Sequence, residues 1–177
     1  MKIKDIKVHL SEEEVNRRVA EMGAEISKTY GDEPVVLICI LKGSVFFTCE
    51  LAKRITSPVE LEFMCVSSYG SGTKSSGVVK IVKDLDCSIE GKNVIVVEDI
   101  IDSGRTLSYL LENLKTRNPK SLRLCTLLDK PERRVCDVKV DYVGFEIPDE
   151  FVVGYGLDYD QRYRNLPYIG YVEIEEE

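Results

Sequence analysis

The stretch Val94–Thr106, VIVVEDIIDSGRT, decides the fold of this chain. It opens with a run of β-branched residues, which is typical of a strand buried on both faces of a sheet. The strand is expected to end at Glu98-Asp99, and the polar segment Asp102–Thr106 then leads into a helix with a leucine face from Leu107 onward. A buried strand joined to a helix by a short polar loop indicates an open parallel α/β sheet, whose ligands bind at the carboxyl ends of the strands.

The polar half of this stretch suits a ribose 5-phosphate. Backbone N–H groups at a helix N-terminus, a glycine for close approach, and the hydroxyls of Ser103 and Thr106 make an anion pocket of the size of one phosphate. Glu98 and Asp99 would repel a bare phosphate, but they suit ribose hydroxyls or a hard cation such as Mg²⁺. The alternative is an acidic turn in which Asp102 or Ser103 caps the helix. That alternative does not explain two acids placed directly after a buried strand.

Strands alternate with helices on both sides of this stretch. Ser11 and Glu14 form a capping box, and apolar residues at helical spacing then predict a helix over residues 12–29. The unbroken apolar run Val35–Leu41 predicts a second buried strand. Further elements are expected as strands at Leu61–Ser67, Val78–Val82, Leu122–Leu128, Val140–Phe145 and Phe151–Tyr155, and as a helix after Ser44 through Arg54. The 177 residues therefore predict one α/β domain, an open, mostly parallel sheet flanked by helices.

The composition argues against several classes of protein. A net charge of −7 disfavours a nucleic-acid binder, which usually carries a basic face. The sequence shows neither a charged-then-apolar leader nor an apolar run near the ~18 residues of a membrane span, so we expect a cytoplasmic protein with no membrane contact. Six scattered cysteines without a C-x-x-C pair, and His9 as the single histidine, disfavour structural zinc. We expect most of the cysteines to be small buried hydrophobes and His9 to be a plain surface residue.

Other phosphate-binding motifs fit poorly. The segment Gly70–Ser75 looks superficially like a P-loop, but G-x-x-x-x-G-K-[ST] cannot be aligned on it and no apolar helical face follows. No G-x-G-x-x-G follows a strand either. A kinase or a dinucleotide-binding protein is therefore disfavoured.

The stretch Val94–Thr106 closely resembles the phosphoribosyl pyrophosphate signature of the type I phosphoribosyltransferases. The resemblance implies that Asp102 lies by N7 of the base as the catalytic general base or acid. It also implies that Glu98 and Asp99 hold the ribose and its metal. The 5′-phosphate loop matches Asp102, Ser103, Gly104, Arg105 and Thr106. Ser103 and Arg105 stand where other members often carry Thr and Lys, and they keep a hydroxyl and a cation.

A second anion site is expected at Leu41-Lys42-Gly43, at the end of a strand. A lone lysine at a strand end is more often a surface residue. The resemblance, however, implies that Lys42 and Gly43 form the pyrophosphate loop, with an unusual cis peptide before Lys42, and that Arg164 also contacts the pyrophosphate. In the Ser- and Gly-rich loop of residues 67–77, Ser68 and Tyr69 match the pair that closes over the site.

The base-binding residues are expected near Lys130 and in the segment from Phe145 to Tyr159. By residue type alone, a core aromatic and a solvated lysine are the more common interpretation of Phe151 and Lys130. The segment nevertheless resembles, almost residue for residue, the hood of the 6-oxopurine phosphoribosyltransferases. The resemblance implies that Lys130 donates to the purine O6, that Phe151 stacks on the purine, and that Val152 contacts it through its backbone. On the same purine side, Asp158 matches a ligand of the second metal.

The resemblance runs from Val35 to Arg164. It implies a single domain over residues 1–177, with a small hood built from the N-terminal segment and about residues 145–177. The implied function is purine salvage: transfer of the 5-phosphoribosyl group from phosphoribosyl pyrophosphate to hypoxanthine, and to guanine, with Mg²⁺, by a homodimer or homotetramer. Two alternatives stay open, a xanthine-preferring transferase and a non-catalytic sensor of phosphoribosyl pyrophosphate. Lys130 argues against adenine, which has no O6 acceptor, and the hood segment argues against pyrimidines.

Overall fold

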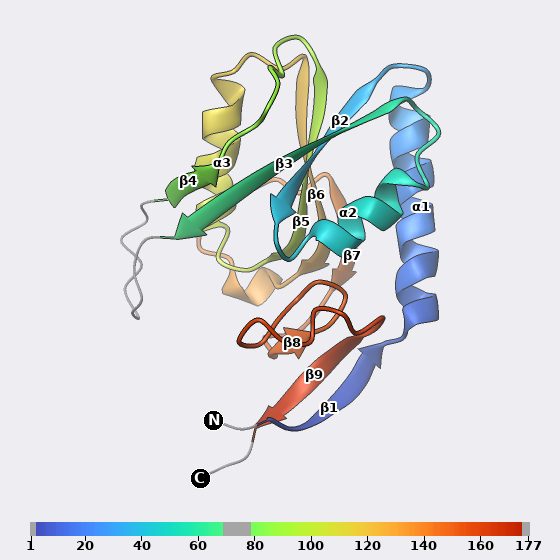
Figure 1. Cartoon of the computed structure of the whole chain (residues 1–177), viewed down its shortest axis with the longest axis vertical. Coiled ribbons are helices and arrows are strands. Elements are labelled where there is room, and N and C mark those ends of the chain that lie inside the picture. The colour runs from blue at the N-terminus through green and yellow to red at the C-terminus, as the bar shows by residue number, and fades with distance from the viewer. Residues whose placement is uncertain (1–2, 69–78, 175–177) are drawn as a thin grey trace.

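The strands form two separate sheets (Figure 1). The structure, a computed structural model, describes residues 3–68 and 79–174. The larger sheet has the strand order β4-β3-β2-β5-β6-β7. Its members are β2 (Val35–Leu41), β3 (Val59–Ser68), β4 (Val79–Lys83), β5 (Asn93–Ile101), β6 (Ser121–Asp129) and β7 (Tyr142–Glu146). Every pairing is parallel except that of β3 with β4. The predicted open, mostly parallel α/β sheet is therefore confirmed.

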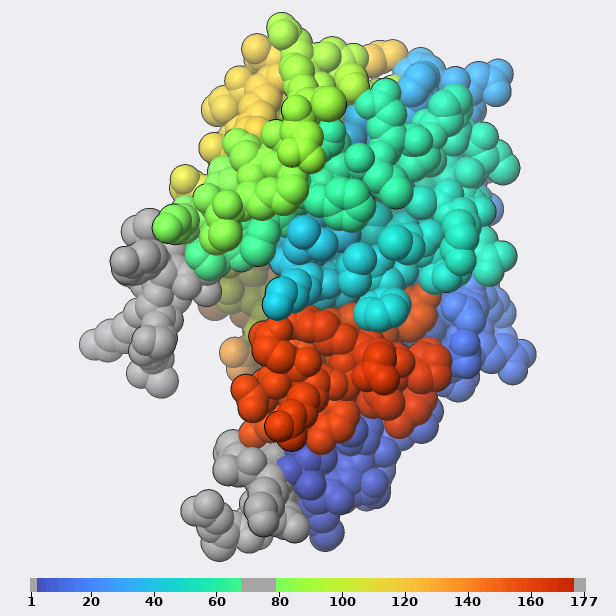
Figure 2. All heavy atoms as spheres, viewed as in Figure 1, coloured from blue at the N-terminus to red at the C-terminus, as the bar shows by residue number. Residues whose placement is uncertain are grey.

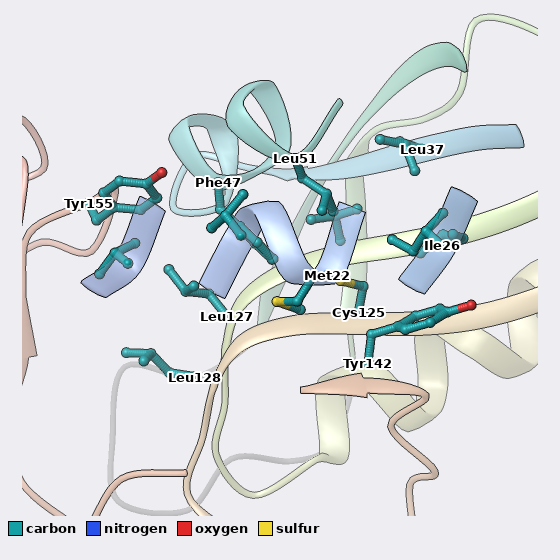
Figure 3. Close-up of a cluster of buried hydrophobic side chains, with 14 of the residues drawn as sticks. Met22, Ile26, Leu37, Phe47, Leu51, Cys125, Leu127, Leu128, Tyr142 and Tyr155 are labelled. Atoms are coloured by element: carbon teal, nitrogen blue, oxygen red, sulfur yellow. The ribbon is translucent and has the colours of Figure 1, made fainter. Parts of the chain in front are cut away.

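Helices cover both faces of this sheet, and this explains the unbroken apolar runs. Helices α1 (Glu12–Tyr30) and α2 (Val45–Ala52) pack on one face, and α3 (Arg105–Lys115) packs on the other. In β2, Leu37 joins the first cluster, whereas its neighbours Val36 and Ile38 join the second. Figure 3 shows the first cluster, which contains Leu37 of β2 together with Phe47 and Leu51 of α2. Successive residues of β2 are buried on opposite faces, so none of them can be polar without cost.

Helix α1 starts where the capping box predicts. The Ser11 hydroxyl accepts from the backbone N–H of Glu14 at 3.2 Å, and the Glu14 carboxylate accepts from the backbone N–H of Ser11 at 2.8 Å. The helix ends one residue beyond the predicted position, at Tyr30, and Gly31 follows at a positive φ of 57°. Its apolar face, with Val15 and Met22 among its members, is fully buried. Local pattern and tertiary packing therefore agree in this element.

The smaller sheet joins the two ends of the chain. Its order is β1-β9-β8, with β1 (Ile3–Leu10), β9 (Ile169–Ile174) and β8 (Val152–Val153), and both pairings are antiparallel. This sheet and the segment of residues 154–168 are called the hood below. The hood lies beneath the carboxyl ends of β2, β5 and β6 (Figure 1), and its surface touches that of α2 (Figure 2). The predicted extent of the hood, which also includes residues 145–151, stays a prediction.

Several expectations for this region are wrong. Strands β1 and β9 were not predicted, because their pairing depends on contacts about the whole chain length apart. The strand expected at Phe151–Tyr155 is limited to Val152–Val153, because Gly154, Tyr155 and Gly156 all have positive φ and turn the chain. His9 is not a plain surface residue. Its ring stacks on Tyr171 at 4.2 Å between centroids, and its Nε2 lies 3.0 Å from the Tyr171 hydroxyl.

The cysteine prediction is also largely wrong. Only Cys39 and Cys125 are buried, Cys49 and Cys87 are exposed, and the remaining two are intermediate. Apolar neighbours in the sequence do not show which face of a helix a cysteine occupies, as Cys49 on α2 illustrates. All six thiols are free. Among the described residues, no helix has the length and apolar character needed to cross a membrane.

Candidate active site

The predicted site residues gather at one edge of the large sheet. Parallel strands end at the same edge, and β2, β5 and β6 are neighbours. Lys42 follows β2, Asp102 follows β5 and Lys130 follows β6. Ile101 and Asp129 are register partners, and the Lys130 N–H donates to the Ile101 carbonyl at 3.0 Å. Asp102 and Lys130 therefore leave adjacent strands at the same level.

The phosphate pocket lies where β5 meets α3. A cavity of about 220 Å³ is lined by residues of a single stretch, Glu98–Asp102, Ser103, Gly104, Thr106 and Leu107. Gly104 caps the first turn of α3 at a φ of +81°, a conformation that favours glycine. The Ser103 hydroxyl accepts from the Arg105 N–H at 3.4 Å. The N–H groups of a helix start and its positive dipole end suit this cavity to an anion.

Glu98 and Asp99 lie within β5, which continues to Ile101 and not only to the predicted end at Asp99. The Asp99 N–H donates to the Glu98 carboxylate at 3.1 Å, and the Asp99 carboxylate accepts from the Ile100 N–H at 2.7 Å. Burial raises the pKa of the Glu98 carboxyl well above its usual range, and the charge of Asp99 adds to this shift. Burial also raises the pKa of Asp99, against the opposing charge of Arg164. Two carboxylates withdrawn from water in this way favour a nearby cation.

These acids fit a divalent cation that takes further ligands from a bound substrate. Mg²⁺ is commonly held by one or two carboxylates together with substrate phosphates and water. Within residues 3–68 and 79–174, no group of three His, Cys, Asp or Glu side chains is placed to hold a metal ion. Substrate oxygens would therefore have to complete the coordination of a cation at Glu98 and Asp99.

The expected pyrophosphate loop packs against the acids. The Leu41–Lys42 peptide is cis, as the resemblance implied. Gly43 leaves no room for a side chain, because a Cβ there would lie 1.6 Å from Asp99 Oδ2. The Lys42 ammonium donates to the Gln161 side-chain carbonyl of the hood at 3.2 Å. The loop after β2 thus contacts both the acid pair of β5 and the hood.

Arg164 and Asp158 meet in the hood, close to this loop. The Arg164 guanidinium forms an ion pair with the Asp158 carboxylate at 2.7 Å and donates to the Gly156 carbonyl at 2.7 Å. Gly156 lies against the pyrophosphate loop, since a Cβ there would lie 1.9 Å from the Gly43 carbonyl oxygen. Gln161 and Gly156 were not predicted as site residues. Nothing in the local sequence shows that they reach the loop after β2.

The two residues expected to read the base are not in their common environments. Lys130 is buried, with a side chain only 10% exposed, so it is not a solvated lysine. Phe151 is 48% exposed and therefore not a core aromatic, and its ring meets Tyr159 edge-on at 5.7 Å. Val152 is buried in β8, where it pairs with Tyr171. An exposed aromatic face can stack on a flat heterocycle, and a buried ammonium can donate to a carbonyl of such a ring.

Asp102 has a partner that the sequence did not suggest. Its side chain is 47% exposed, and its Oδ1 accepts from Arg133 Nε at 2.9 Å. Arg133 also donates to Asp149 of the segment that leads into the hood, at 3.3 Å. The expected loop residues Ser68 and Tyr69 cannot be placed at the site: Ser68 ends β3, but its side chain and all of Tyr69 lie outside the described residues.

Comparisons with known proteins give the family. The family model for the phosphoribosyl transferase domain matches residues 10–160, and the chain therefore belongs to the phosphoribosyltransferase family. It is 57% identical over 173 residues to the hypoxanthine-guanine phosphoribosyltransferase of Mycobacterium avium, an alignment that covers 94% of this chain and 85% of that protein. It is also 57% identical over 164 residues to the enzyme of the same name from Bacillus subtilis, covering 93% of this chain and 91% of the relative.

The fold comparison agrees. A crystal structure of a hypoxanthine-guanine phosphoribosyltransferase from Bacillus anthracis superposes with a TM-score of 0.92 at 49% sequence identity. The superposition covers 97% of this chain and 100% of that one. The family membership and the fold class that the resemblance implied are confirmed.

Proposed function

We propose that this chain transfers the 5-phosphoribosyl group from phosphoribosyl pyrophosphate to hypoxanthine and guanine, giving IMP and GMP with release of pyrophosphate. The reaction belongs to purine salvage. The observation that carries the proposal is that an anion pocket, an acid pair, a lysine loop and the buried Lys130 lie at one edge of the sheet. Phe151, on the segment that leads into the hood, stays exposed. The high identity to relatives named for this reaction supports it.

Phosphoribosyl pyrophosphate would bind along the loops after β5 and β2. The 5′-phosphate would occupy the pocket at the start of α3, where Ser103, Gly104 and Thr106 line the cavity. Arg105 adds a cation to this loop. The ribose hydroxyls would face the Glu98 and Asp99 carboxylates. These acids can accept hydrogen bonds from hydroxyl groups, which a phosphate cannot donate.

The leaving pyrophosphate would lie between the loop after β2 and the hood. Lys42 and Arg164 are the cations on its two sides, and Gly43 lets its backbone approach. Preorganised positive charge of this kind stabilises the negative charge that develops as the leaving group departs. Glu98 and Asp99 would hold one Mg²⁺ together with substrate oxygens, and Asp158, on the hood side, would be a ligand of a second Mg²⁺. When bound, Mg²⁺ supplies further charge neutralisation at the pyrophosphate.

The purine would stack on Phe151, with its O6 facing Lys130 and its N7 facing Asp102. Attack by the purine nitrogen on C1′ breaks the bond to pyrophosphate and is expected to pass through an oxocarbenium-like state, as in glycoside cleavage. Asp102 would hold or accept the N7 proton during this displacement. General acid–base catalysis of this kind typically contributes ~10²–10⁴-fold to the rate. The Val152 backbone would add a contact to the base.

The chain is also proposed to be a cytoplasmic homo-oligomer, a dimer or tetramer. Support comes from apolar side chains that stay exposed in the single chain, Phe46 on α2 and Leu61 on β3. In the proposed oligomer, other copies of the chain would cover these side chains. Sedimentation of the purified protein measures the state, and a monomer at all concentrations would contradict this part of the proposal.

Steady-state kinetics with four bases tests the reaction. Hypoxanthine, guanine, xanthine and adenine are compared at saturating phosphoribosyl pyrophosphate. We expect turnover of hypoxanthine and guanine and none of adenine, because Lys130 requires an O6 acceptor. The highest kcat/KM with xanthine would support the xanthine-preferring alternative. Tight binding of phosphoribosyl pyrophosphate without turnover of any base would instead support a non-catalytic sensor.

A further inference from the structure

We propose that Arg133 is a positioning residue that aims the Asp102 carboxylate at the purine, and that Asp149 anchors Arg133 from the segment that leads into the hood. This inference rests on the proposed role of Asp102 and deepens it. Arg133 does not itself line the phosphate pocket; its contact with that pocket is the ion pair with Asp102, through which it acts on the reaction.

Asp102, proposed to face N7, and Lys130, proposed to face O6, are connected through Arg133 and Asp149. The four side chains alternate in charge. Arg133 Nε lies 2.9 Å from Asp102 Oδ1, and another nitrogen of the same guanidinium lies 3.3 Å from Asp149 Oδ2. The other oxygen of Asp149, Oδ1, lies 3.7 Å from the Lys130 ammonium. The sequence of charges is therefore Asp102, Arg133, Asp149 and Lys130. Both carboxylates compete for Arg133, and together they raise the pKa of its guanidinium, so it stays charged.

The geometry of a purine explains why such a connection matters. N7 and O6 lie on one edge of a rigid bicyclic ring, so the groups that face them must keep a fixed spacing. Burial already restricts Lys130. Asp102 is half exposed and has no comparable packing to hold its rotamer. The ion pair holds one carboxylate oxygen, and among the described residues no hydrogen bond occupies the other, Oδ2. That oxygen is available to face N7.

The backbone around Asp102 is held by other bonds. Arg134 Nε donates to the Asp102 carbonyl at 3.3 Å. The Val135 and Cys136 N–H groups donate to the Ser103 carbonyl at 3.0 and 3.2 Å. The phosphate pocket therefore does not depend on the Arg133 side chain. Loss of that side chain should release the orientation of the Asp102 carboxylate and leave the 5′-phosphate loop in place.

The exposure of its ion pairs indicates that Arg133 contributes little to the free energy of unfolding. Its side chain and both of its carboxylate partners are about half exposed. Exposed ion pairs contribute little to the free energy of unfolding, because water and salt screen them. If replacement of Arg133 strongly lowers turnover without a matching loss of stability, the result therefore indicates a positioning role.

The test compares Arg133→Gln and Arg133→Lys with a matched control, Arg117→Gln. Arg117 pairs with Asp84 at 2.7 Å at a surface far from the sheet edge that holds the site. We expect Arg133→Gln to lower kcat about 10- to 100-fold, the scale of a displaced catalytic group, with the KM for phosphoribosyl pyrophosphate nearly unchanged. Arg133→Lys keeps the cation and should recover part of the loss. Arg117→Gln should leave both constants at the wild-type values. Wild-type kcat in Arg133→Gln, or an equal loss in Arg117→Gln, would overturn the proposal.

A double-mutant cycle separates positioning from a general structural effect. If Arg133 acts through Asp102, Arg133→Gln should cost nothing further in an Asp102→Asn background. Additive losses would overturn the proposal. Full turnover in Asp102→Asn alone would instead contradict the proposed role of Asp102 itself, so the two failures can be told apart.

Discussion

The two halves of the proposed site are built in different ways. The phosphoribosyl half consists of Lys42-Gly43 and Glu98–Thr106, which follow or end buried strands and offer mainly backbone groups and partly buried acids. The proposed purine half consists of Lys130 and residues 149–158, and it depends on side chains: Lys130 pairs with Asp149, and Phe151 meets Tyr159 of the hood. The first half is part of the rigid sheet. The second half requires two segments to meet that are distant in the sequence.

This difference predicts which substrate is affected by a substitution in each half. A change in the purine half should alter the use of the base and leave phosphoribosyl pyrophosphate binding intact. A change at the contact between the hood and the loop after β2 should alter both the use of the base and the binding of phosphoribosyl pyrophosphate. Asp102 contacts both halves. It is part of the 5′-phosphate loop by sequence, and its carboxylate pairs with Arg133, which also donates to Asp149 of the purine half.

The largest expected effect is that of Asp102→Asn. Asparagine keeps the size of the side chain but cannot accept the N7 proton, so kcat should fall ~10²–10⁴-fold. The affinity for phosphoribosyl pyrophosphate should change far less, because the 5′-phosphate pocket is mainly backbone. Pre-steady-state kinetics with a calorimetric binding measurement checks both. Unchanged turnover rules out the proton-transfer role.

Lys130→Gln should have the next largest effect. A hydrogen bond to a charged group contributes about 1.5–3 kcal/mol, which predicts a loss of roughly 10- to 150-fold in kcat/KM for hypoxanthine. Adenine is the informative control base. Gain of adenine activity would support the O6 assignment more strongly than loss alone, whereas wild-type kinetics with hypoxanthine would eliminate it.

Gly156→Ala tests the contact between the hood and the loop after β2. Gly156 has a φ of +102°, and an added Cβ would lie 1.9 Å from the Gly43 carbonyl oxygen. We expect the free energy of unfolding to fall by about 1–3 kcal/mol from backbone strain, with a further loss from the clash. Gly91→Ala is the matched control, because Gly91 has a φ of +70° and no atom within 4 Å of its added Cβ.

Urea denaturation of both glycine variants gives the comparison. A larger loss in Gly156→Ala than in Gly91→Ala, with a raised KM for phosphoribosyl pyrophosphate only in the former, is the expected result. Equal stability losses and unchanged kinetics would mean that the hood does not rest on the loop after β2.

Tyr171→Phe should have the smallest effect, and it should be confined to the hood. The substitution removes the hydrogen bond to His9 and keeps the stacked rings. The expected cost is about 0.5–1.5 kcal/mol in the free energy of unfolding, with kcat unchanged. A thermal melt with an activity assay at the same temperature measures both. A loss of kcat at full stability would mean that this pair reaches the active site.

The strand, loop and helix that carry the proposed phosphoribosyl half could be predicted well because their signals are local. A buried strand, two acids and a glycine at a helix start stand within thirteen consecutive residues, Val94–Thr106. The cap of α1 was placed correctly for the same reason. Even here the end of β5 was misplaced, because Glu98 and Asp99 are polar yet continue the ladder with β6. Pairing with a neighbouring strand overrides the local polarity of the residues.

The purine half could not be predicted from residue type. A lysine is usually solvated and a phenylalanine usually buried, but Lys130 and Phe151 have the opposite environments. Tertiary contacts set both environments: Lys130 lies by Asp149, and Phe151 meets Tyr159 of the hood. The resemblance to the 6-oxopurine enzymes pointed to these residues where the pattern did not. Neither the residue pattern nor the resemblance pointed to Arg133 and Asp149, because their proposed role depends on ion pairs that the tertiary structure brings together.

The separation of the two halves is tested most directly by calorimetric titration of phosphoribosyl pyrophosphate into wild-type protein and Lys130→Gln. If the phosphoribosyl half binds independently of the purine half, the two Kd values should agree within about threefold, as expected of uncoupled sites. The same Lys130→Gln preparation should show the large loss in kcat/KM for hypoxanthine. A Kd for phosphoribosyl pyrophosphate that weakens in proportion to that loss would contradict the division of the site into two halves.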